Sequence, residues 1–127
     1  MRENKSIRIP VKNAYEILVR LLLPQGILDF FELTNVTQTD IGLQLYLEEK
    51  NIIPLEYQEQ KLESKGFLPE IMVQDFPIRG QKVNLHIKRR RWEVKDTGEI
   101  ITRDWKLVSK GARITTEFGN FLKGIFG

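Results

Sequence analysis

Four consecutive cations, Lys88 to Arg91, followed at once by Trp92, are the residues of this chain best suited to chemistry. Lysine and arginine side chains bind phosphate oxygens, and an aromatic ring beside them can pack against a sugar. The run therefore suggests a phosphate-binding surface. The alternative is a solvated strand end whose charges discourage pairing between sheet edges, which is the commoner meaning of a charge run.

The residues before the cations predict the strand that positions them. Residues 83–88 alternate apolar with polar side chains, which is the period of a half-buried strand. A regular continuation would carry Arg89 and Arg91 into the core, where unpaired charges are costly. We therefore expect the strand to leave the core after Ile87, at an edge or a bulge, and to present the four cations as one exposed cluster.

Charge is unevenly distributed along the chain, whose net charge is only +3. Residues 14–63 hold three cations and nine acids, whereas residues 64–127 hold thirteen cations and seven acids. The second half is therefore expected to meet a polyanion. The candidate nucleic-acid contacts are Arg79, Lys82, Lys88, Arg89, Arg90, Arg91, Trp92, Lys95, Arg103 and Lys106, and Lys110 and Arg113 continue the set toward the C-terminus. Nothing in the set specifies which bases would be read.

Catalysis and metal binding have little support in the sequence. The chain has no cysteine and one histidine, His86, which is too few for the usual zinc ligands. Asp75, Asp96 and Asp104 could be imagined as a metal-binding carboxylate set. Turn formation beside Gly98 explains Asp96 better, and surface pairing explains Asp104 better. We expect a protein that is not an enzyme and that has no metal and no cofactor.

Hydrophobic periodicity predicts an α+β fold, with a mostly antiparallel β-sheet, a helix near each terminus and a single domain spanning residues 1–127. Helices are expected over residues 9–23 and after Thr115, where Phe118, Phe121, Leu122 and Ile125 have helical spacing. Strands are expected over residues 28–36, 41–47, 68–76, 83–88 and 100–108, with hairpin turns at 77–80 and 95–99. Residues 48–65 are expected to be a solvated acidic insertion with at most a short helix, ending in a break at 64–66.

The sequence contains no sign of a membrane span. No apolar run reaches the roughly 18 residues that a spanning helix needs. The polar residues 1–5 lack the apolar core of a signal peptide, so we expect a cytoplasmic protein with no membrane partner.

Six short stretches occur in one order along the chain: Glu48–Asn51, Lys61–Phe67, Gln74–Gly80, Arg89–Trp92, Thr97–Glu99 and Arg103–Trp105. This series resembles the N-terminal-region proteins of certain bacterial insertion-sequence transposases, in which the transposase is split into a short first protein and a separate catalytic one. The resemblance covers about residues 18–124, and its most specific parts are Asp75–Gly80 and Arg89–Trp92.

The resemblance implies DNA binding without catalysis. In such transposases an N-terminal part helps to bind the terminal inverted repeats of the element, and a downstream part holds the catalytic carboxylates. Larger members carry a zinc-binding N-terminal part with a similar turn and an Arg pair before cysteines. Gln74–Pro77 and Arg89–Arg91 match that layout, but every cysteine is absent, so zinc does not carry over. Apolar packing around Trp92 would have to replace the metal, so Trp92 is expected either to pack inside the protein or to stack on a sugar.

Two hypotheses follow for the function. The first is a DNA-binding component of a transposition system, which contacts element-end DNA through the basic strand end. The second is a protein-interaction domain, whose basic face docks onto an acidic patch of the separate catalytic transposase subunit while its two helices supply the apolar contact. Salt-dependent binding of the isolated chain to element-end DNA would favour the first.

Overall fold

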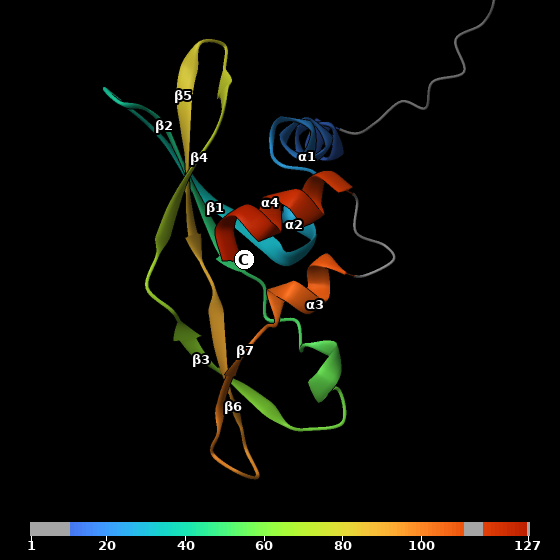
Figure 1. Ribbon diagram of the computed structural model, residues 1–127. Coiled ribbons are helices and arrows are strands. Elements are labelled where there is room, and N and C mark those ends of the chain that lie inside the picture. Colours follow the sequence, from blue (N-terminus) through green and yellow to red (C-terminus); the bar gives the residue numbers. More distant parts are fainter. Residues whose placement is uncertain (1–10, 111–115, 127) are drawn as a thin grey trace, which may run out of the picture.

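The computed structural model describes residues 11–110 and 116–126, and these form an α+β protein with helices at both ends of the chain and two small sheets (Figure 1). The first sheet has the strand order β1-β2-β5-β4. Its strands are β1 (Phe31–Thr39), β2 (Gly42–Glu49), β4 (Ile71–Ile78) and β5 (Gln81–Lys88). All neighbours are antiparallel except β2 and β5, which run parallel from Leu43 opposite Val83 to Glu48 opposite Lys88.

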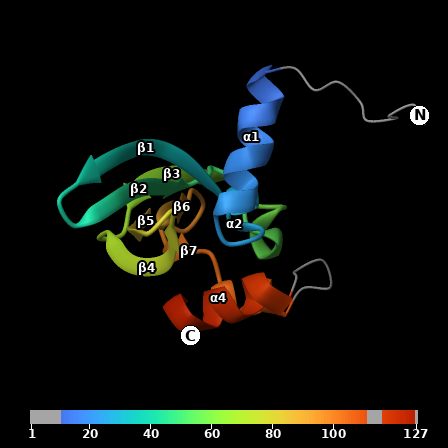
Figure 2. The same ribbon diagram turned by 90° about the horizontal axis from the view of Figure 1, so that it is seen from above.

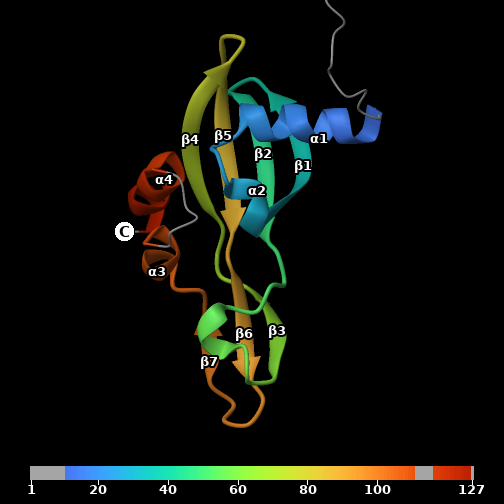
Figure 3. The same cartoon turned by 90° about the vertical axis from the view of Figure 1, so that its right-hand side faces the viewer.

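Two strands of the first sheet, β4 and β5, are directly connected along the chain to strands of a second sheet. It consists of β3 (Leu62–Phe67), β6 (Arg90–Val94) and β7 (Ile100–Thr102), with β6 in the centre. Only Arg89 separates β5 from β6, and its carbonyl oxygen accepts a hydrogen bond of 2.8 Å from the Leu68 N–H. The chain therefore forms one long antiparallel ribbon, bent at Arg89, that runs through both sheets (Figure 3).

Arg89 is also where the alternation of the ribbon changes phase. Before it, the buried apolar side chains are those at odd positions, Val83, Leu85 and Ile87. After it, the buried side chains are Trp92 and Val94, at even positions. The strand therefore leaves the main core after Ile87 as expected, but it does so at a single irregular residue between two inner strands of different sheets and not at a sheet edge.

Four helices complete the described part of the chain: α1 (Val11–Leu22), α2 (Ile27–Phe30), α3 (Trp105–Ser109) and α4 (Thr116–Phe126). Phe118 and Leu122 of α4 are buried in the main core together with strand residues of the first sheet. Trp105 stacks on Phe31 at 5.3 Å and on Phe126 at 5.1 Å between ring centroids, so aromatic contacts join α3, α4 and the start of β1. In contrast, α1 projects beyond the body of the protein (Figure 2).

Three predicted elements are wrong in part. Residues 28–30 are helical and not extended, because Gly26, at φ +90°, turns the chain and α2 begins at the next residue, Ile27. The strand predicted over 100–108 ends at Thr102, because the Asp104 side chain accepts hydrogen bonds from the backbone of Lys106 and Leu107 and so caps α3. The break predicted at 64–66 lies inside β3, which pairs with β6. The predicted cap at Thr115 and the cation Arg113 lie outside the described residues.

A substitution at Gly42 tests how closely the parallel strands β2 and β5 approach each other. Gly42 has φ +122°, and a Cβ at this position would overlap the carbonyl oxygen of Lys82 on β5. Replacing Gly42 with Ala should therefore lower the free energy of unfolding by more than about 2 kcal/mol in urea denaturation. The matched control is Gly80→Ala, which also has positive φ but no atom within 4 Å of the added Cβ. It should cost about 1 kcal/mol from backbone strain alone. Equal losses would show that β2 and β5 have room for a side chain.

Candidate nucleic-acid interface

The four cations that follow β5 do not form one exposed cluster, so this expectation is wrong. All four side chains are half-buried. Lys88 ends β5 opposite Glu48, Arg89 sits at the bend, and Arg90 and Arg91 begin β6 with successive side chains on opposite faces of its sheet. The phase change at Arg89 therefore sends neighbouring cations in different directions.

Arg90 belongs to an internal network around Glu49, which is only 1% exposed. The Arg90 backbone N–H donates to Glu49 Oε1 at 2.9 Å, and its Nε donates to the Glu49 carbonyl oxygen at 3.0 Å. Arg103 completes the network, because its Nε donates to Glu49 Oε2 at 2.7 Å. Burial raises the pKa of Glu49 above its ordinary value, and the hydrogen bonds from Arg103 and Arg90 offset only part of that effect. Glu49 is therefore not part of a solvated acidic insertion.

Aromatic rings surround the Arg103 guanidinium. Its Cζ lies 5.4 Å from the ring centroid of Phe30, 5.6 Å from that of Trp92 and 5.7 Å from that of Trp105. Trp92 is completely buried and donates its Nε1–H to Asn51 Oδ1 at 2.8 Å. Trp92 is therefore a packing residue, as the packing alternative expected, and neither Trp92 nor Arg103 is exposed to contact DNA in this fold.

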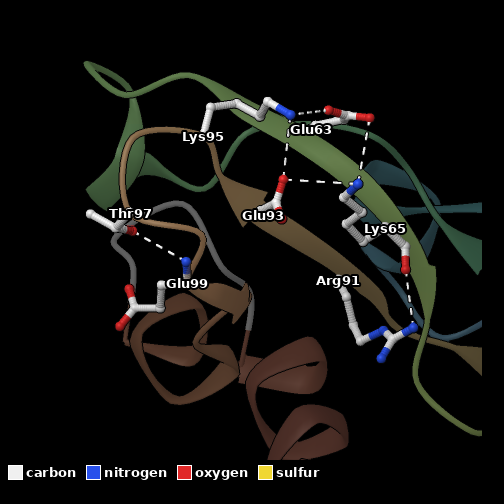
Figure 4. Close-up of polar contacts among 7 residues, drawn as sticks. All are labelled: Glu63, Lys65, Arg91, Glu93, Lys95, Thr97 and Glu99. Atoms are coloured by element: carbon white, nitrogen blue, oxygen red, sulfur yellow. Dashed lines mark hydrogen bonds and ion pairs between the residues drawn. The ribbon is translucent and has the colours of Figure 1, made fainter.

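The outer face of the second sheet carries a ladder of alternating charges (Figure 4). Lys95 Nζ lies 2.6 Å from Glu63 and 3.4 Å from Glu93, and Lys65 contacts the same two carboxylates at 3.7 and 3.8 Å. The hydrogen bond between Lys95 and Glu63 raises the pKa of Lys95 and lowers that of Glu63. Arg91 donates to the Lys65 carbonyl oxygen at 3.1 Å. This ladder neutralises most of its own charge, so Lys95 is poorly placed to bind a phosphate.

A second group of cations lies around Phe126, on the side of the protein formed by α3 and α4. The guanidinium Cζ of Arg89 lies 5.0 Å from the ring centroid of Phe126. Lys106 and Lys123 line a small cavity beside the same ring, and Lys110 follows Lys106 by one helical turn. We call Arg89, Lys106, Lys110 and Lys123 the helix patch.

The helix patch has one property that suits an anion site. None of its four cations forms an ion pair with a carboxylate in the described part of the chain. Lys123 was not among the predicted contacts, because no pattern in its own segment is basic. Its spacing of three residues from Phe126 on α4 places it beside that ring.

The remaining predicted contacts, Arg79 and Lys82, lie at the tip of the ribbon between β4 and β5, at the top of Figure 1. Both side chains are exposed. Arg79 has φ +53° and is followed by Gly80 at φ +79°, which makes the tight turn between the two strands. Lys88, half-buried at the end of β5, lines a pocket together with Glu48, Glu70 and His86. The structure therefore separates the predicted contacts into a ribbon tip, this pocket, a self-neutralised ladder, an internal network and part of the helix patch.

Comparison with protein-family models, curated proteins and solved structures finds no significant match to this chain.

The described residues offer no alternative site for metal chemistry. Among them, no group of three or more histidine, aspartate or glutamate side chains is arranged to hold a metal ion. His86 lies on a strand face between Glu70, 2.9 Å from Nδ1, and Gln44, 2.6 Å from Nε2, and stacks on Tyr46. No helix in this part of the chain is long and apolar enough to cross a membrane.

The buried ion pair predicts a large effect for a single substitution. Replacing Arg103 with Ala should lower the free energy of unfolding by about 3–5 kcal/mol, because Glu49 would stay buried without its partner. Glu63→Gln, on the exposed ladder, serves as the control and should leave the urea midpoint unchanged. An Arg103→Ala protein as stable as the control would show that Glu49 is compensated elsewhere.

Glu49 should also make stability depend on pH. Because its pKa is raised in the folded protein, the stability that Glu49 contributes is fully present below its ordinary pKa of 4.5 and is lost as the pH rises through the folded value. Glu49→Gln removes this titration. The free energy of unfolding of the wild-type protein, relative to that of Glu49→Gln, should therefore fall as the pH rises above 4.5. A difference that rises with pH would contradict the raised pKa.

Proposed function

We propose that this protein is a non-catalytic DNA-binding component of a bacterial transposition system, which contacts element-end DNA. The observation that carries the proposal is the helix patch. Arg89, Lys106 and Lys123 come from the ribbon bend, α3 and α4 and lie around one aromatic ring without a carboxylate partner in the described residues. The sequence resemblance to split-transposase proteins supports the same function.

The chemistry of the patch suits phosphate. The donors of a guanidinium lie in its own plane, so Arg89 keeps donors at its rim while its face lies over Phe126. The exposed lysines add point charges, and each phosphate that they neutralise releases counterions. Contacts of this kind hold a duplex in place and carry no sequence information.

A second function, docking onto a separate catalytic transposase subunit, is favoured by a different surface. Phe76, on the edge strand β4, is 86% exposed. It lines an open groove of about 530 Å³ together with Phe121 and the carboxylates Asp75 and Glu117. Burial, with a smaller contribution from Glu117, raises the pKa of Asp75. An apolar groove with two carboxylates suits a protein segment better than it suits DNA.

The slope of DNA affinity against salt tests the first function. Replacing both Lys106 and Lys123 with Ala should weaken binding to element-end and scrambled duplexes alike. The slope of log affinity against log salt should become shallower by about 1.8, or 0.9 per lost phosphate contact. Fluorescence anisotropy across a salt series measures both quantities. Folding should persist, because both side chains are exposed.

The matched control removes the same charge from the ladder. Lys65→Ala combined with Lys95→Ala should leave the slope unchanged, because these lysines are already paired with Glu63 and Glu93. Arg79→Ala with Lys82→Ala shows whether the ribbon tip adds contacts. A folded Lys106→Ala, Lys123→Ala protein that keeps the wild-type affinity and slope would remove the helix patch from any DNA interface and favour the docking function.

A further inference from the structure

The helix α1 carries an apolar stripe that the rest of the described protein does not cover. Ile17, Leu18 and Leu21 are 44%, 52% and 77% exposed. With Ala14, which is also exposed, they fall within an arc of about 100° on the helix surface. Figures 2 and 3 show α1 extending away from the sheet. At its C-terminal end the stripe reaches the groove described above, because Leu21 lines that groove together with Phe76 and Phe121. Among the described residues nothing covers Ile17, Leu18 and Leu21.

The contact between α1 and the body lies on another side of the helix. Val19 packs against the main core, and Leu23, just after the helix, is buried in it. The polar side is satisfied within the chain, since Arg20 pairs with Glu16 at 3.6 Å and with Asp29 at 3.0 Å. A helix of 12 residues is marginal in isolation. Covering the stripe would therefore stabilise α1 without breaking these ion pairs.

The stripe is complementary to itself. When two α1 helices are placed antiparallel about a two-fold axis between positions 17 and 18, Ile17 faces Leu18 of the other copy and the small Ala14 faces the large Leu21. Small side chains opposite large ones let two helices pack closely, and a two-fold interface requires that one surface fit itself. A parallel arrangement would instead place Leu21 against Leu21 and Ala14 against Ala14.

The exposed area is sufficient for such a contact. Tyr15 and Leu22, which are 65% and 45% exposed, flank the stripe. Together with Ile17, Leu18 and Leu21 they present roughly 500 Å² on each copy, so a contact that covered all of it on both copies would bury at most about 1,000 Å². This is near the lower limit for a specific interface, so the expected dimer is one of moderate affinity.

We propose that a second copy of this chain covers the stripe, and that the protein forms a two-fold dimer through antiparallel α1 helices. The interface lies apart from the helix patch and its formation does not depend on DNA. Two copies of each DNA-binding surface are then carried in one particle. The two proposals can fail separately. A dimer that does not bind DNA would contradict only the proposed function, and a monomer that binds DNA would contradict only the dimer.

Sedimentation equilibrium of the full chain from about 5 to 500 μM tests the dimer. The expected mass rises from 14.9 kDa toward twice that value with concentration. Leu21→Glu should hold the protein at the monomer mass, with a circular dichroism spectrum still that of a folded protein. Leu55→Glu is the matched control, because Leu55 is similarly exposed but lies in the 3-10 helix Leu55–Tyr57, and it should keep the dimer.

A size swap tests the antiparallel register. Leu21→Ala leaves a gap and Ala14→Leu overfills the contact, so each should weaken the dimer at least tenfold. The double variant exchanges the two sizes and restores the pairing of small with large only in the antiparallel arrangement, so it should recover most of the affinity. In a parallel arrangement the two defects would add.

Cysteine cross-linking gives a second measurement, because the natural chain contains no cysteine. Mixing the Ala14→Cys and Leu21→Cys proteins under mild oxidation should give a disulfide-linked heterodimer in preference to either homodimer. A wild-type protein that is monomeric at every concentration would overturn the proposal and assign the stripe to a different partner. A dimer unaffected by Leu21→Glu, or preferential cross-linking of Ala14→Cys to itself, would also overturn it.

Discussion

The ion pair between Glu49 and Arg103 is the interaction on which the rest of the structure depends. Glu49 is the last residue of β2, in the first sheet, and Arg103 follows β7, in the second. The same carboxylate accepts the backbone N–H of Arg90 at the start of β6. One buried acid thus joins three segments from both sheets. Trp92 of the smaller core and Trp105 of the main core both pack against the Arg103 guanidinium.

This arrangement makes the two cores depend on each other. If either sheet formed alone, Glu49 or Arg103 would lack its counter-ion and the aromatic and backbone groups that surround the pair. Among the described residues, the buried apolar side chains of the smaller core are Trp92, Val94 and Ile101, which is little for independent stability. The continuous ribbon through Arg89 provides the covalent link, and the ion pair fixes its geometry. Substitutions at the junction should therefore affect both sheets together.

Local sequence patterns predicted the strands and turns that short-range residues specify, and they failed where contacts with residues distant in the sequence determine the structure. The alternation over residues 83–88 and the Gly-containing turns at 77–80 and 95–99 were sufficient to place β5 and two hairpins. β3 was missed because its exposed face is polar, and Glu63 and Lys65 are stabilised by Glu93 and Lys95 on the next strand. Composition alone gives such a segment no strand signal.

The candidate site shows the same limit more sharply. The sequence places Arg89, Arg90 and Arg91 together, but the partner of Arg90 is 41 residues away and the ring beneath Arg89 is 37 residues away. Successive side chains on a strand point to opposite faces of the sheet, so a run of cations is divided between two faces, and the phase change at Arg89 separates its members further. A patch built from several elements does not show up in the sequence as a run of cations. Lys123 therefore belongs to the helix patch although no pattern in its own segment is basic.

The nature of the helix patch limits what it could contribute to the DNA binding that we propose. Its lysines are flexible point charges on exposed helix surfaces, and such groups neutralise phosphates without distinguishing base pairs. Arg89 is the most constrained donor, because the bend in the ribbon and the Phe126 ring hold it in place. A protein with this surface would recognise a particular site through the spacing of its contacts or the shape of the DNA. Two copies related by a two-fold axis would supply a fixed spacing, which a single copy does not have.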